Sequence, residues 1–296
     1  MGSASDQTRI VVTGAGGHIG GEVCRQLKNS GLNLLALDLS SESANDLVAC
    51  DLRKADHIAR IFQSNSVSAV IHLAGILPSA FQRDPLTGVD VNVNGSVELL
   101  RQAAKAGTKR LVFASSMSVY GSSASTHPLT ENDPAAPDEP YGASKRAFEV
   151  VGEALANGNA IEFVALRIAR VVGPGIIKTS SPWRSEIFEP LPGQMAISIP
   201  FAAEAVLSLV HVEDVARMLV LLAEAPEVSS SIYNTPVELW KANRLKTVVE
   251  ETTGIHVELE GGANGGPICD GSRFAHKFGF RLRGLQSHLS DRATQI

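Results

Sequence analysis

The sequence of 296 residues predicts an α/β fold, in which a doubly wound parallel sheet is followed by a smaller C-terminal substrate lobe. Short apolar runs alternate with helical patterns from residue 10 to residue 166, and a glycine-rich turn joins the first run to the first helical pattern. Helices cover both faces of a parallel sheet, so its strands read as nearly continuous apolar runs. After Gly173-Pro174-Gly175 the alternation weakens and prolines and glycines interrupt the pattern, which indicates a separate lobe.

The individual elements follow from the same periodicities. The strand-like runs cover residues 10–12, 34–37, 69–73, 110–114 and 161–166. The helical patterns cover residues 22–28, 97–106, 144–156, 212–224 and 242–252. The proline-rich stretch 127–140 predicts neither helix nor strand, because proline removes a backbone donor. We expect a flexible leader over residues 1–8, a main domain over 9–175 and a smaller lobe over 176–296, with the region of His211 returning to the main domain.

Composition and charge exclude several classes of protein. Hydrophobic residues make up 44% and charged residues 19% of the chain, which is typical of a globular protein and not of a disordered one. The net charge of -5 provides no basic field for a phosphate backbone, so we expect no nucleic acid partner. No apolar run suits a membrane helix and the N-terminus lacks an apolar signal core, which favours a cytoplasmic protein without a membrane partner. The three cysteines are far apart, so we expect neither a disulfide framework nor a bound metal.

The turn between the first strand and the first helix carries a functional signal. Gly14, Gly17 and Gly20 are spaced for a tight turn, a close approach of the backbone to a pyrophosphate, and close helix packing. The N–H groups at the start of the following helix would point at that anion. The pattern predicts a dinucleotide site, and a glycine-rich turn without a ligand is the alternative.

Acidic residues after the next two apolar runs refine this prediction. Asp38 lies at the distance where a carboxylate takes the adenine ribose hydroxyls, and no arginine follows it to bind a 2′-phosphate. NAD is therefore favoured over NADP, and capping of a helix is the alternative role of Asp38. Asp51 and Leu52 follow another short run and could similarly reach the adenine.

A tyrosine and a lysine provide candidate acid–base groups. Tyr141 and Lys145 are four residues apart, which on a helix places both on one face. A lysine cation and the positive nicotinamide ring of a cofactor favour the phenolate, so Tyr141 can take a proton from an alcohol. Ser116 lies where a strand-like run ends, and it could hold the reacting oxygen against Tyr141. An exposed helix face is the alternative for the Tyr–Lys pair, and turn or capping roles are expected for Ser115 and Ser118.

Several motifs occur in a fixed order along the chain. They are Thr13-Gly14-x-x-Gly17-x-x-Gly20, His72-Leu73-Ala74-Gly75, Asn92-Val93-Asn94-Gly95-Ser96, Ser115-Ser116-x-Ser118-Val119-Tyr120-Gly121, Tyr141-x-x-x-Lys145 and His211-Val212-Glu213-Asp214-Val215-Ala216. Together they resemble the extended short-chain dehydrogenase/reductase family, and the NAD-dependent epimerase/dehydratase branch fits best. The resemblance extends over residues 9–175 and resumes at residues 211–216.

The resemblance implies a Rossmann-like fold, NAD as the cofactor, and a catalytic triad of Ser116, Tyr141 and Lys145. Lys145 would also hold the nicotinamide ribose, and Asn92 would order the backbone behind the triad. A homodimer formed through two helices, one of them bearing Tyr141, is also implied. The residues implied to line the NAD site are Gly14, Gly17, His18, Ile19, Asp38, Asp51, Leu52, Leu73, Ala74, Gly75, Asn92 and Lys145.

Two histidines in these motifs invite a metal or acid–base interpretation. His72 and His211 each lie in a structural motif of the family, and neither has ligand partners at a suitable spacing. We expect both to be packed, hydrogen-bonded histidines.

The shared chemistry is hydride transfer from a secondary alcohol carbon, and the sequence departs from two branches of the family. Dehydratases carry an Asp-Glu pair where this chain has Met117-Ser118, so dehydration is disfavoured. Nucleotide-sugar members typically have an asparagine where this chain has Arg170, and an Arg-Asp pair where it has Leu207-Ser208. Because both features contact the diphosphate in those members, the departures argue against a nucleotide-diphosphate substrate.

An arginine in the substrate crevice also suits a carboxylate, which it can bind in bidentate fashion. The segment 179–191, which contains Arg184, resembles sugar-acid dehydrogenases of the same family. We therefore expect Arg170 and Arg184 to bind substrate together with Ser116 and Tyr141, with a surface or interlobe ion pair as the alternative for both arginines. The favoured function is an NAD-dependent dehydrogenase of a small sugar or sugar acid. A nucleotide-sugar epimerase that retains its NAD and a non-catalytic NAD-sensing protein are the alternatives.

Overall fold

The computed structural model describes residues 8–39, 46–122, 125, 127–175 and 181–293. Contacts divide the chain into two compact units. The first unit comprises residues 1–121, 135–167 and 216–233, and the second comprises residues 122–134, 168–215 and 234–296. Residues 1–7 of the predicted leader lie outside the described residues, as do residues 179 and 180 of the segment that resembles sugar-acid dehydrogenases.

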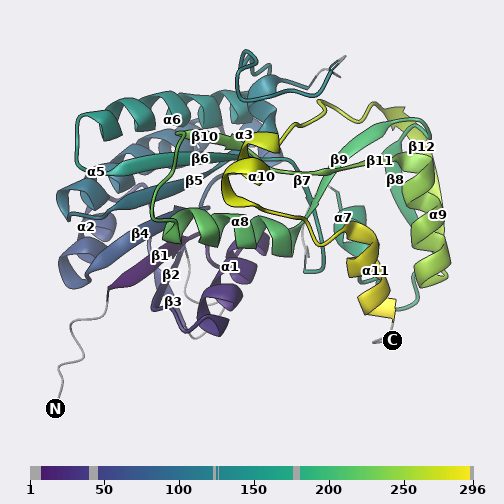
Figure 1. The fold of residues 1–296 in the computed structure, drawn as a ribbon, viewed down its shortest axis with the longest axis horizontal. Helices are drawn as coiled ribbons and strands as arrows, with labels where there is room; N and C mark the ends of the chain where they lie inside the picture. Colours follow the sequence, from purple (N-terminus) through teal and green to yellow (C-terminus); the bar gives the residue numbers. More distant parts are fainter. Residues whose placement is uncertain (1–7, 40–45, 123–124, 126, 176–180, 294–296) are drawn as a thin grey trace. The chain divides into compact units, whose positions relative to one another are not determined.

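A seven-stranded sheet forms the centre of the first unit (Figure 1), and its strand order is β10-β6-β5-β4-β1-β2-β3. The pairs β1–β2, β2–β3, β1–β4 and β4–β5 are parallel. The chain winds outward from β1 in both directions, so a topological switch point lies between β1 and β4. The predicted doubly wound, Rossmann-like sheet is thus confirmed. Its strands are β1 (Arg9–Thr13), β2 (Leu34–Asp38), β3 (Leu47–Ala49), β4 (Val67–His72), β5 (Arg110–Ser116), β6 (Glu162–Ile168) and β10 (Ile232–Asn234).

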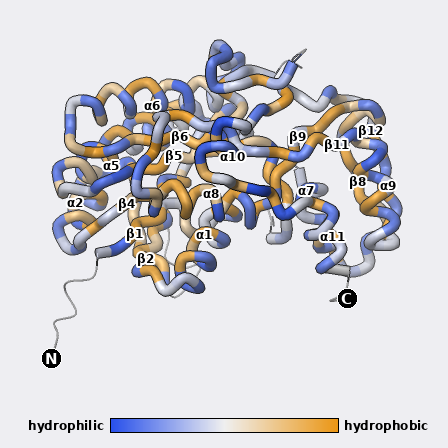
Figure 2. The backbone as a smooth tube through the Cα atoms, in the orientation of Figure 1, coloured by the Kyte–Doolittle hydropathy of each residue, from blue (hydrophilic) through white to orange (hydrophobic). Residues whose placement is uncertain are grey.

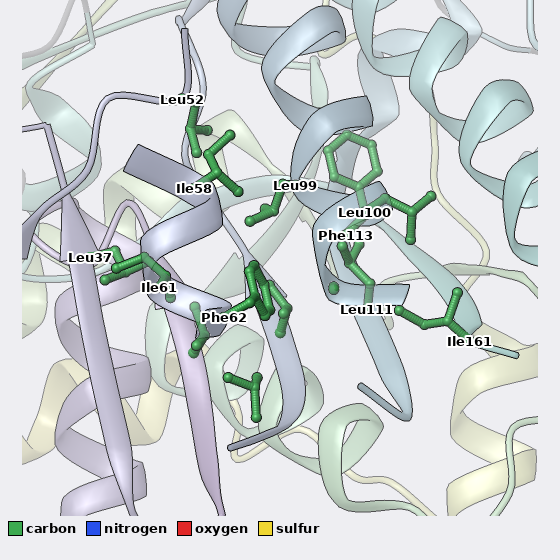
Figure 3. Close-up of a cluster of buried hydrophobic side chains, with 14 of the residues drawn as sticks. Leu37, Leu52, Ile58, Ile61, Phe62, Leu99, Leu100, Leu111, Phe113 and Ile161 are labelled. Carbon is green, nitrogen blue, oxygen red and sulfur yellow. The ribbon is translucent and has the colours of Figure 1, made fainter. Parts of the chain in front are cut away.

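Helices cover both faces of this sheet (Figure 1). On one face α2 and α5 bury Ile58 and Leu99 in a cluster with strand residues such as Phe113 (Figure 3), and Phe148 of α6 belongs to the same cluster. Figure 2 shows hydrophobic residues concentrated along the central strands. Phe113 and Phe148 meet edge to face at 4.7 Å between ring centroids, a favourable aromatic geometry. The longer helices are α1 (His18–Asn29), α2 (Ala55–Ser64), α5 (Ser96–Lys105), α6 (Pro140–Asn157) and α8 (Val212–Glu224); the short ones are α3 (Pro78–Arg83), α4 (Pro85–Val89), the π-helix η1 (Asp90–Gly95) and the 3-10 helix η2 (Met117–Tyr120).

The second unit has two small sheets with their own core. One sheet has the order β11-β9-β7, and the other pairs β12 with β8 in parallel. Trp183, Phe188, Leu245 and Val257 belong to the core of this unit. Within the described part of the chain, no helix is both long and apolar enough to cross a membrane. The elements are β7 (Arg170–Val172), α7 (Trp183–Glu186), β8 (Ala196–Phe201), β9 (Val206–His211), β11 (Glu238–Lys241), α9 (Ala242–Thr253), β12 (His256–Ala263), α10 (Ser272–Phe278) and α11 (Leu285–Ala293).

The two units interleave along the chain, where the sequence predicted a boundary at residue 175 and a return to the main domain in the region of His211. Residues 122–134 and 168–175 belong to the second unit, and residues 216–233 belong to the first. His211 groups with the second unit, because it ends β9, which pairs with both β7 and β11. We keep the division into a cofactor-binding part and a substrate-binding part as a proposal.

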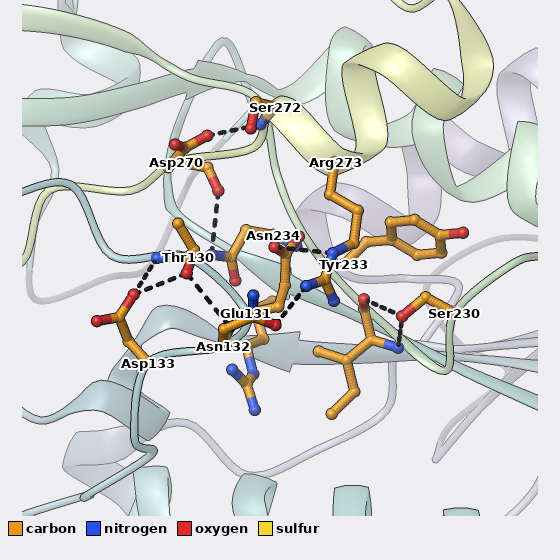
Figure 4. A network of polar contacts seen from close by, with 12 residues as sticks. Thr130, Glu131, Asn132, Asp133, Ser230, Tyr233, Asn234, Asp270, Ser272 and Arg273 are labelled. Carbon is orange, nitrogen blue, oxygen red and sulfur yellow. Dashed lines mark hydrogen bonds and ion pairs between the residues drawn. The ribbon is translucent and has the colours of Figure 1, made fainter.

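Residues 127–134 of the proline-rich stretch belong to the second unit and form an ordered turn (Figure 4). Asp133 accepts hydrogen bonds from the backbone N–H and the hydroxyl of Thr130, both at 2.8 Å. The amide of Asn234 donates to Leu129 O at 3.0 Å and to Asp270 O at 3.1 Å, while Glu131 accepts from the Asn234 backbone at 2.7 Å. These bonds fix the turn without regular structure, apart from an isolated bridge between Leu129 and Cys269.

Candidate active site

The glycine turn of the first unit is shaped so that only glycine fits at two positions. Gly14 has a φ of +69°, and a Cβ there would lie 2.7 Å from the backbone nitrogen of Ala74. A Cβ on Gly20 would lie 2.1 Å from the carbonyl oxygen of Gly14. Gly17 is the N-cap of α1 and has no side chain to bond the first N–H groups of the helix. A helix N-terminus without a side-chain cap leaves N–H donors available, which is the arrangement that binds a phosphate.

The two acidic residues predicted near the adenosine have different partners. Asp38 ends β2 and accepts the backbone N–H groups of Gly16 and Leu39 at 2.8 and 2.7 Å, so it shapes the glycine turn directly. The carboxylate of Asp51 is bound by the guanidinium of Arg53 at 2.9 and 2.8 Å, which lowers its pKa. The carboxylate of Asp51 is therefore already paired, and its role toward the adenine stays a prediction together with that of Leu52.

The ends of β1 and β4 are joined beside the turn. Thr13 Oγ1 accepts the backbone N–H groups of Leu73 and Ala74, both at 3.2 Å. His72 is hydrogen-bonded at both ring nitrogens, at 2.7 Å to Thr13 Oγ1 and at 2.8 Å to Ser96 Oγ, and burial lowers its pKa to about 3. His72 is thus the packed, hydrogen-bonded histidine that was predicted, and its low pKa keeps the ring neutral.

Ser116, Tyr141 and Lys145 come together in the first unit, from the end of β5 and the first turns of α6. A hydrogen bond from Ser116 lowers the pKa of Tyr141, but burial outweighs it and raises that pKa to about 12. Lys145 Nζ donates to Ala114 O at 2.8 Å and lies 5.7 Å from the centre of the Tyr141 ring. Burial lowers the pKa of Lys145 to about 8. The phenol is therefore protonated at neutral pH in the protein alone, and additional positive charge is needed to favour phenolate.

Asn92 orders the backbone around this cluster. It lies in the π-helix η1, where its Oδ1 accepts from Ile76 N at 2.7 Å and its Nδ2 donates to Ile76 O at 3.0 Å. The same Nδ2 donates to Ser144 Oγ at 3.2 Å, and Ser144 donates to Tyr141 O at 2.7 Å. A Cβ on Gly75 would lie 3.5 Å from Lys145 Nζ, so the backbone at Gly75 passes close to the ammonium.

These residues fit a dinucleotide cofactor. The uncapped start of α1 suits the pyrophosphate, and Asp38 lies beside it at the end of β2. His18, the first residue of α1, has a pKa lowered to about 4 by burial, and its Nε2 is buried without a hydrogen-bond partner among the described residues. Ile19 follows it in the same turn. Bound NAD would supply a hydride acceptor. Its positive nicotinamide ring would also provide the additional charge that favours the phenolate of Tyr141.

Arg170 and Arg184 lie in the second unit, on β7 and α7. Arg170 donates to Gly265 O at 3.1 Å and packs over the Phe201 ring at 4.7 Å. Burial and the nearby charge of Arg184 lower the pKa of Arg170 to about 10, and burial also lowers the pKa of Arg184. Among the described residues, the buried Nε of Arg184 has no hydrogen-bond partner, and no carboxylate forms an ion pair with either arginine. The ion-pair alternative considered for these residues is thus not found in the described part of the chain.

One cluster near His211 was missed by reading motifs. His211, Glu213 and His288 have potential ligand atoms within 4.8 Å of one another. His288 lies on α11, so only long-range packing brings it to His211. The two imidazole rings stack at 3.6 Å between centroids with an interplanar angle of 15°, which keeps their in-plane lone pairs from converging on one ion. The stack therefore packs α11 against the end of β9.

The first unit therefore has the fold of a nicotinamide-dependent oxidoreductase and contains a Ser-Tyr-Lys cluster. Residues 10–235 match the model of the NAD dependent epimerase/dehydratase family, and the chain belongs to that family. The predicted family and the NAD cofactor are thus confirmed. The resemblance to extended short-chain dehydrogenases/reductases therefore rests on more than local motifs.

Individual relatives are similar over different lengths. UDP-glucose 4-epimerase of Lacticaseibacillus casei is 32% identical over 173 residues, which are 55% of this chain and 52% of that protein. The chain thus spans about half the length of that curated relative. The crystal structure of Thermus thermophilus UDP-glucose 4-epimerase complexed with NAD has a TM-score of 0.80 and 25% identity, covering 97% of this chain and 98% of that chain. MoeE5 in complex with UDP-glucuronic acid and NAD has a TM-score of 0.81 and 27% identity, covering 97% and 98%.

These similarities change the balance between the functions considered. The dehydrogenase of a small sugar or sugar acid favoured by the sequence is not confirmed, and the epimerase alternative fits the relatives better. Arg170 and Leu207-Ser208 depart from the nucleotide-sugar pattern at two places in a fold that matches the Thermus thermophilus UDP-glucose 4-epimerase structure over 97% of this chain.

Proposed function

We propose that this protein is an NAD-dependent epimerase of a nucleotide sugar, acting at C4 of a UDP-sugar and retaining its NAD between turnovers. The observation that carries the proposal is the cluster of Ser116, Tyr141 and Lys145 in the unit that holds the glycine turn. The relatives named as UDP-glucose 4-epimerases support the choice of reaction. A non-catalytic NAD sensor is disfavoured, because binding alone does not require this cluster.

The residues of the cluster have distinct tasks in this reaction. Ser116 holds the substrate hydroxyl beside Tyr141, and Tyr141 takes the hydroxyl proton as the carbon loses its hydride to the cofactor. Lys145 provides the positive charge that favours the phenolate of Tyr141. Bound NAD would accept hydride from the sugar carbon and give it back on the opposite face of the ketone, and Tyr141 would return the proton to the oxygen. The net change is inversion at one carbon, with no net oxidation.

The direct experiment is incubation of the purified protein with UDP-glucose or UDP-galactose, followed by NMR of the sugar resonances. We expect the other epimer to accumulate over many turnovers while the absorbance of NADH stays constant. Formation of NADH in proportion to an oxidised sugar would instead support the dehydrogenase alternative. Uronic and aldonic acids with added NAD belong in the same panel, because they are the substrates of that alternative.

The sugar-acid dehydrogenase remains a second candidate because of the two buried arginines. Two guanidinium groups without a described carboxylate partner are costly to bury, so an anion bound between them would stabilise both. A sugar carboxylate and a substrate diphosphate share this chemistry. We therefore propose that Arg170 and Arg184 bind the anionic part of the substrate.

Arg170→Ala is expected to raise KM for anionic substrates about 10- to 100-fold, because a charged hydrogen bond contributes about 1.5–3 kcal/mol. The kcat value should change little, because Arg170 is assigned to binding and not to proton transfer. Steady-state kinetics with a UDP-sugar, a uronic acid and a neutral sugar measure the effect. Arg244→Ala is the matched control, since Arg244 is an exposed arginine of the same unit. An unchanged ratio of KM values between anionic and neutral substrates would contradict the assignment.

A homodimer is proposed for the assembled protein. Val150, Val151 and Leu155 are exposed hydrophobic residues on α6, the helix that bears Tyr141 and Lys145. Covering them against a second copy would remove apolar surface from water. This agrees with the interface implied by the family resemblance, and we also keep the predicted cytoplasmic location as a proposal.

A further inference from the structure

A buried carboxylate lies next to the Ser-Tyr-Lys cluster and has no task in the reaction described above. Glu149 is fully buried on α6, one turn beyond Lys145 and two turns beyond Tyr141. Residues spaced in this way share one face of a helix. A buried carboxylate is stable only when it is paired and fully hydrogen-bonded, so its partners identify the parts of the fold that it holds together.

The carboxylate of Glu149 joins α6 to two strands. Its Oε1 accepts from Ser115 Oγ on β5 at 2.6 Å and from Arg167 Nε on β6 at 2.9 Å. Its Oε2 accepts from Arg167 Nη2 at 2.8 Å and from Arg146 Nη1 at 3.0 Å. Arg167 is buried as well, and its Nη1 donates to the hydroxyl of Tyr120 at 2.7 Å. These four donors account for both oxygens of the carboxylate.

The contacts of α6 fix three successive residues at the end of β5. Lys145 bonds the carbonyl of Ala114, Glu149 bonds the side chain of Ser115, and Ser116 forms its hydrogen bond with Tyr141. Successive side chains of a strand point to opposite sides, so the direction of Ser115 sets the direction of Ser116. We propose that Glu149 is a positioning residue for the redox step, which holds Ser115 and Arg167 so that Ser116 stays beside Tyr141. This inference rests on the proposed function.

The same position gives Glu149 an electrostatic effect on Lys145. The groups facing the ammonium are Tyr141 and Glu149 on α6, the Phe113 ring on β5, and His72 on β4, which is neutral. Burial lowers the pKa of Lys145, and the negative charge of Glu149 raises it. Removal of that charge therefore lets Lys145 lose its proton at a lower pH, which weakens the stabilisation of the Tyr141 phenolate.

The test compares Glu149→Gln and Ser115→Ala with Glu153→Gln. Glu153 lies further along α6 and bonds Ser231, so its variant makes the same charge change away from Lys145. We expect Glu149→Gln and Ser115→Ala to lower kcat about tenfold or more with KM unchanged. The alkaline limb of the kcat profile should move to lower pH in Glu149→Gln only. The double variant should be no slower than Glu149→Gln, because both changes break one contact.

A second measurement separates this inference from the proposed function. The dissociation constant of NAD is measured by titration from pH 6 to pH 10 without any sugar. A wild type that turns over no sugar would show that the proposed function is wrong. The positioning role would still be supported if NAD affinity falls at a lower pH in Glu149→Gln than in the wild type and in Glu153→Gln. Two variants that match Glu153→Gln in kcat, pH profile and NAD affinity would overturn the role. Glu149→Gln leaves the guanidinium of Arg167 without its countercharge and can therefore fail to fold. In that case Ser115→Ala decides, and a wild-type kcat in that variant overturns the positioning role of Glu149.

Discussion

Tyr141→Phe is expected to bind NAD as the wild type does and to lose roughly 10³-fold of its turnover, within the range that general acid–base catalysis contributes. The substitution removes only the hydroxyl that exchanges a proton with the substrate. The glycine turn and Asp38, which are assigned to NAD, lie on β1, β2 and α1 and are not altered. Epimerisation rates and NAD titrations on the same preparations measure the two effects.

Tyr233→Phe is the matched control for this substitution. Tyr233 is a buried tyrosine whose hydroxyl bonds Ser229, so the same atom is removed at a site without a role in the reaction. Its turnover should stay near that of the wild type. A Tyr141→Phe variant that keeps nearly full activity would show that another group moves the proton.

Gly20→Ala is expected to lower the affinity for NAD at least about 100-fold. The new Cβ would lie 2.1 Å from the Gly14 carbonyl oxygen and 2.8 Å from Ala15 Cα. Both are backbone atoms, so the start of α1 has to move away from the glycine turn. Such overpacking also lowers the free energy of unfolding, by about 1–3 kcal/mol. Calorimetric NAD titration and thermal unfolding measure the two effects.

Gly21→Ala provides the neighbouring control on the same helix. The nearest atom to a Cβ at Gly21 is 3.9 Å away, which is an ordinary contact. Alanine favours helix over glycine by up to about 1 kcal/mol, so this variant should be as stable as the wild type or slightly more stable. Equal NAD affinity in Gly20→Ala and Gly21→Ala would contradict the assignment of the glycine turn.

The central strands of the seven-stranded sheet could be predicted because they are continuous apolar runs. The runs predicted at residues 34–37 and 69–73 correspond to β2 and β4, within two residues at each end. The segment of β3 was recognised only as a short run before Asp51 and was not predicted as a strand, because it has only three residues and two of them are exposed. The helix α2 was also missed, although Ile58, Ile61 and Phe62 are buried at helical spacing and its signal was present.

The second unit was less predictable because its strands depend on distant partners. β8 pairs with β12 and β7 pairs with β9, so each strand is stabilised by residues far along the chain. The prolines and glycines between them hide any period of two. Local spacing therefore predicted α9 in this unit but none of its strands.

Site residues were predictable where chemistry depends on local spacing. Tyr141 and Lys145 are one turn apart, and the glycine turn is a continuous motif, so both could be read from the sequence. Glu149 continues the same spacing by one more turn, and that signal was available but overlooked. The stacking of His288 on His211 depends on tertiary packing, which no local pattern records.

The central claim is that hydride leaves the sugar and returns to the same carbon on a retained cofactor. The most direct test uses UDP-glucose deuterated at C4, incubated with the protein and an excess of unlabelled free NAD, with mass spectrometry of the sugar and of the nucleotide. We predict that deuterium stays on C4 of both UDP-sugar epimers and that the free nucleotide pool stays unlabelled. Deuterium appearing in free NADH, together with an oxidised sugar, would contradict the claim and identify a dehydrogenase.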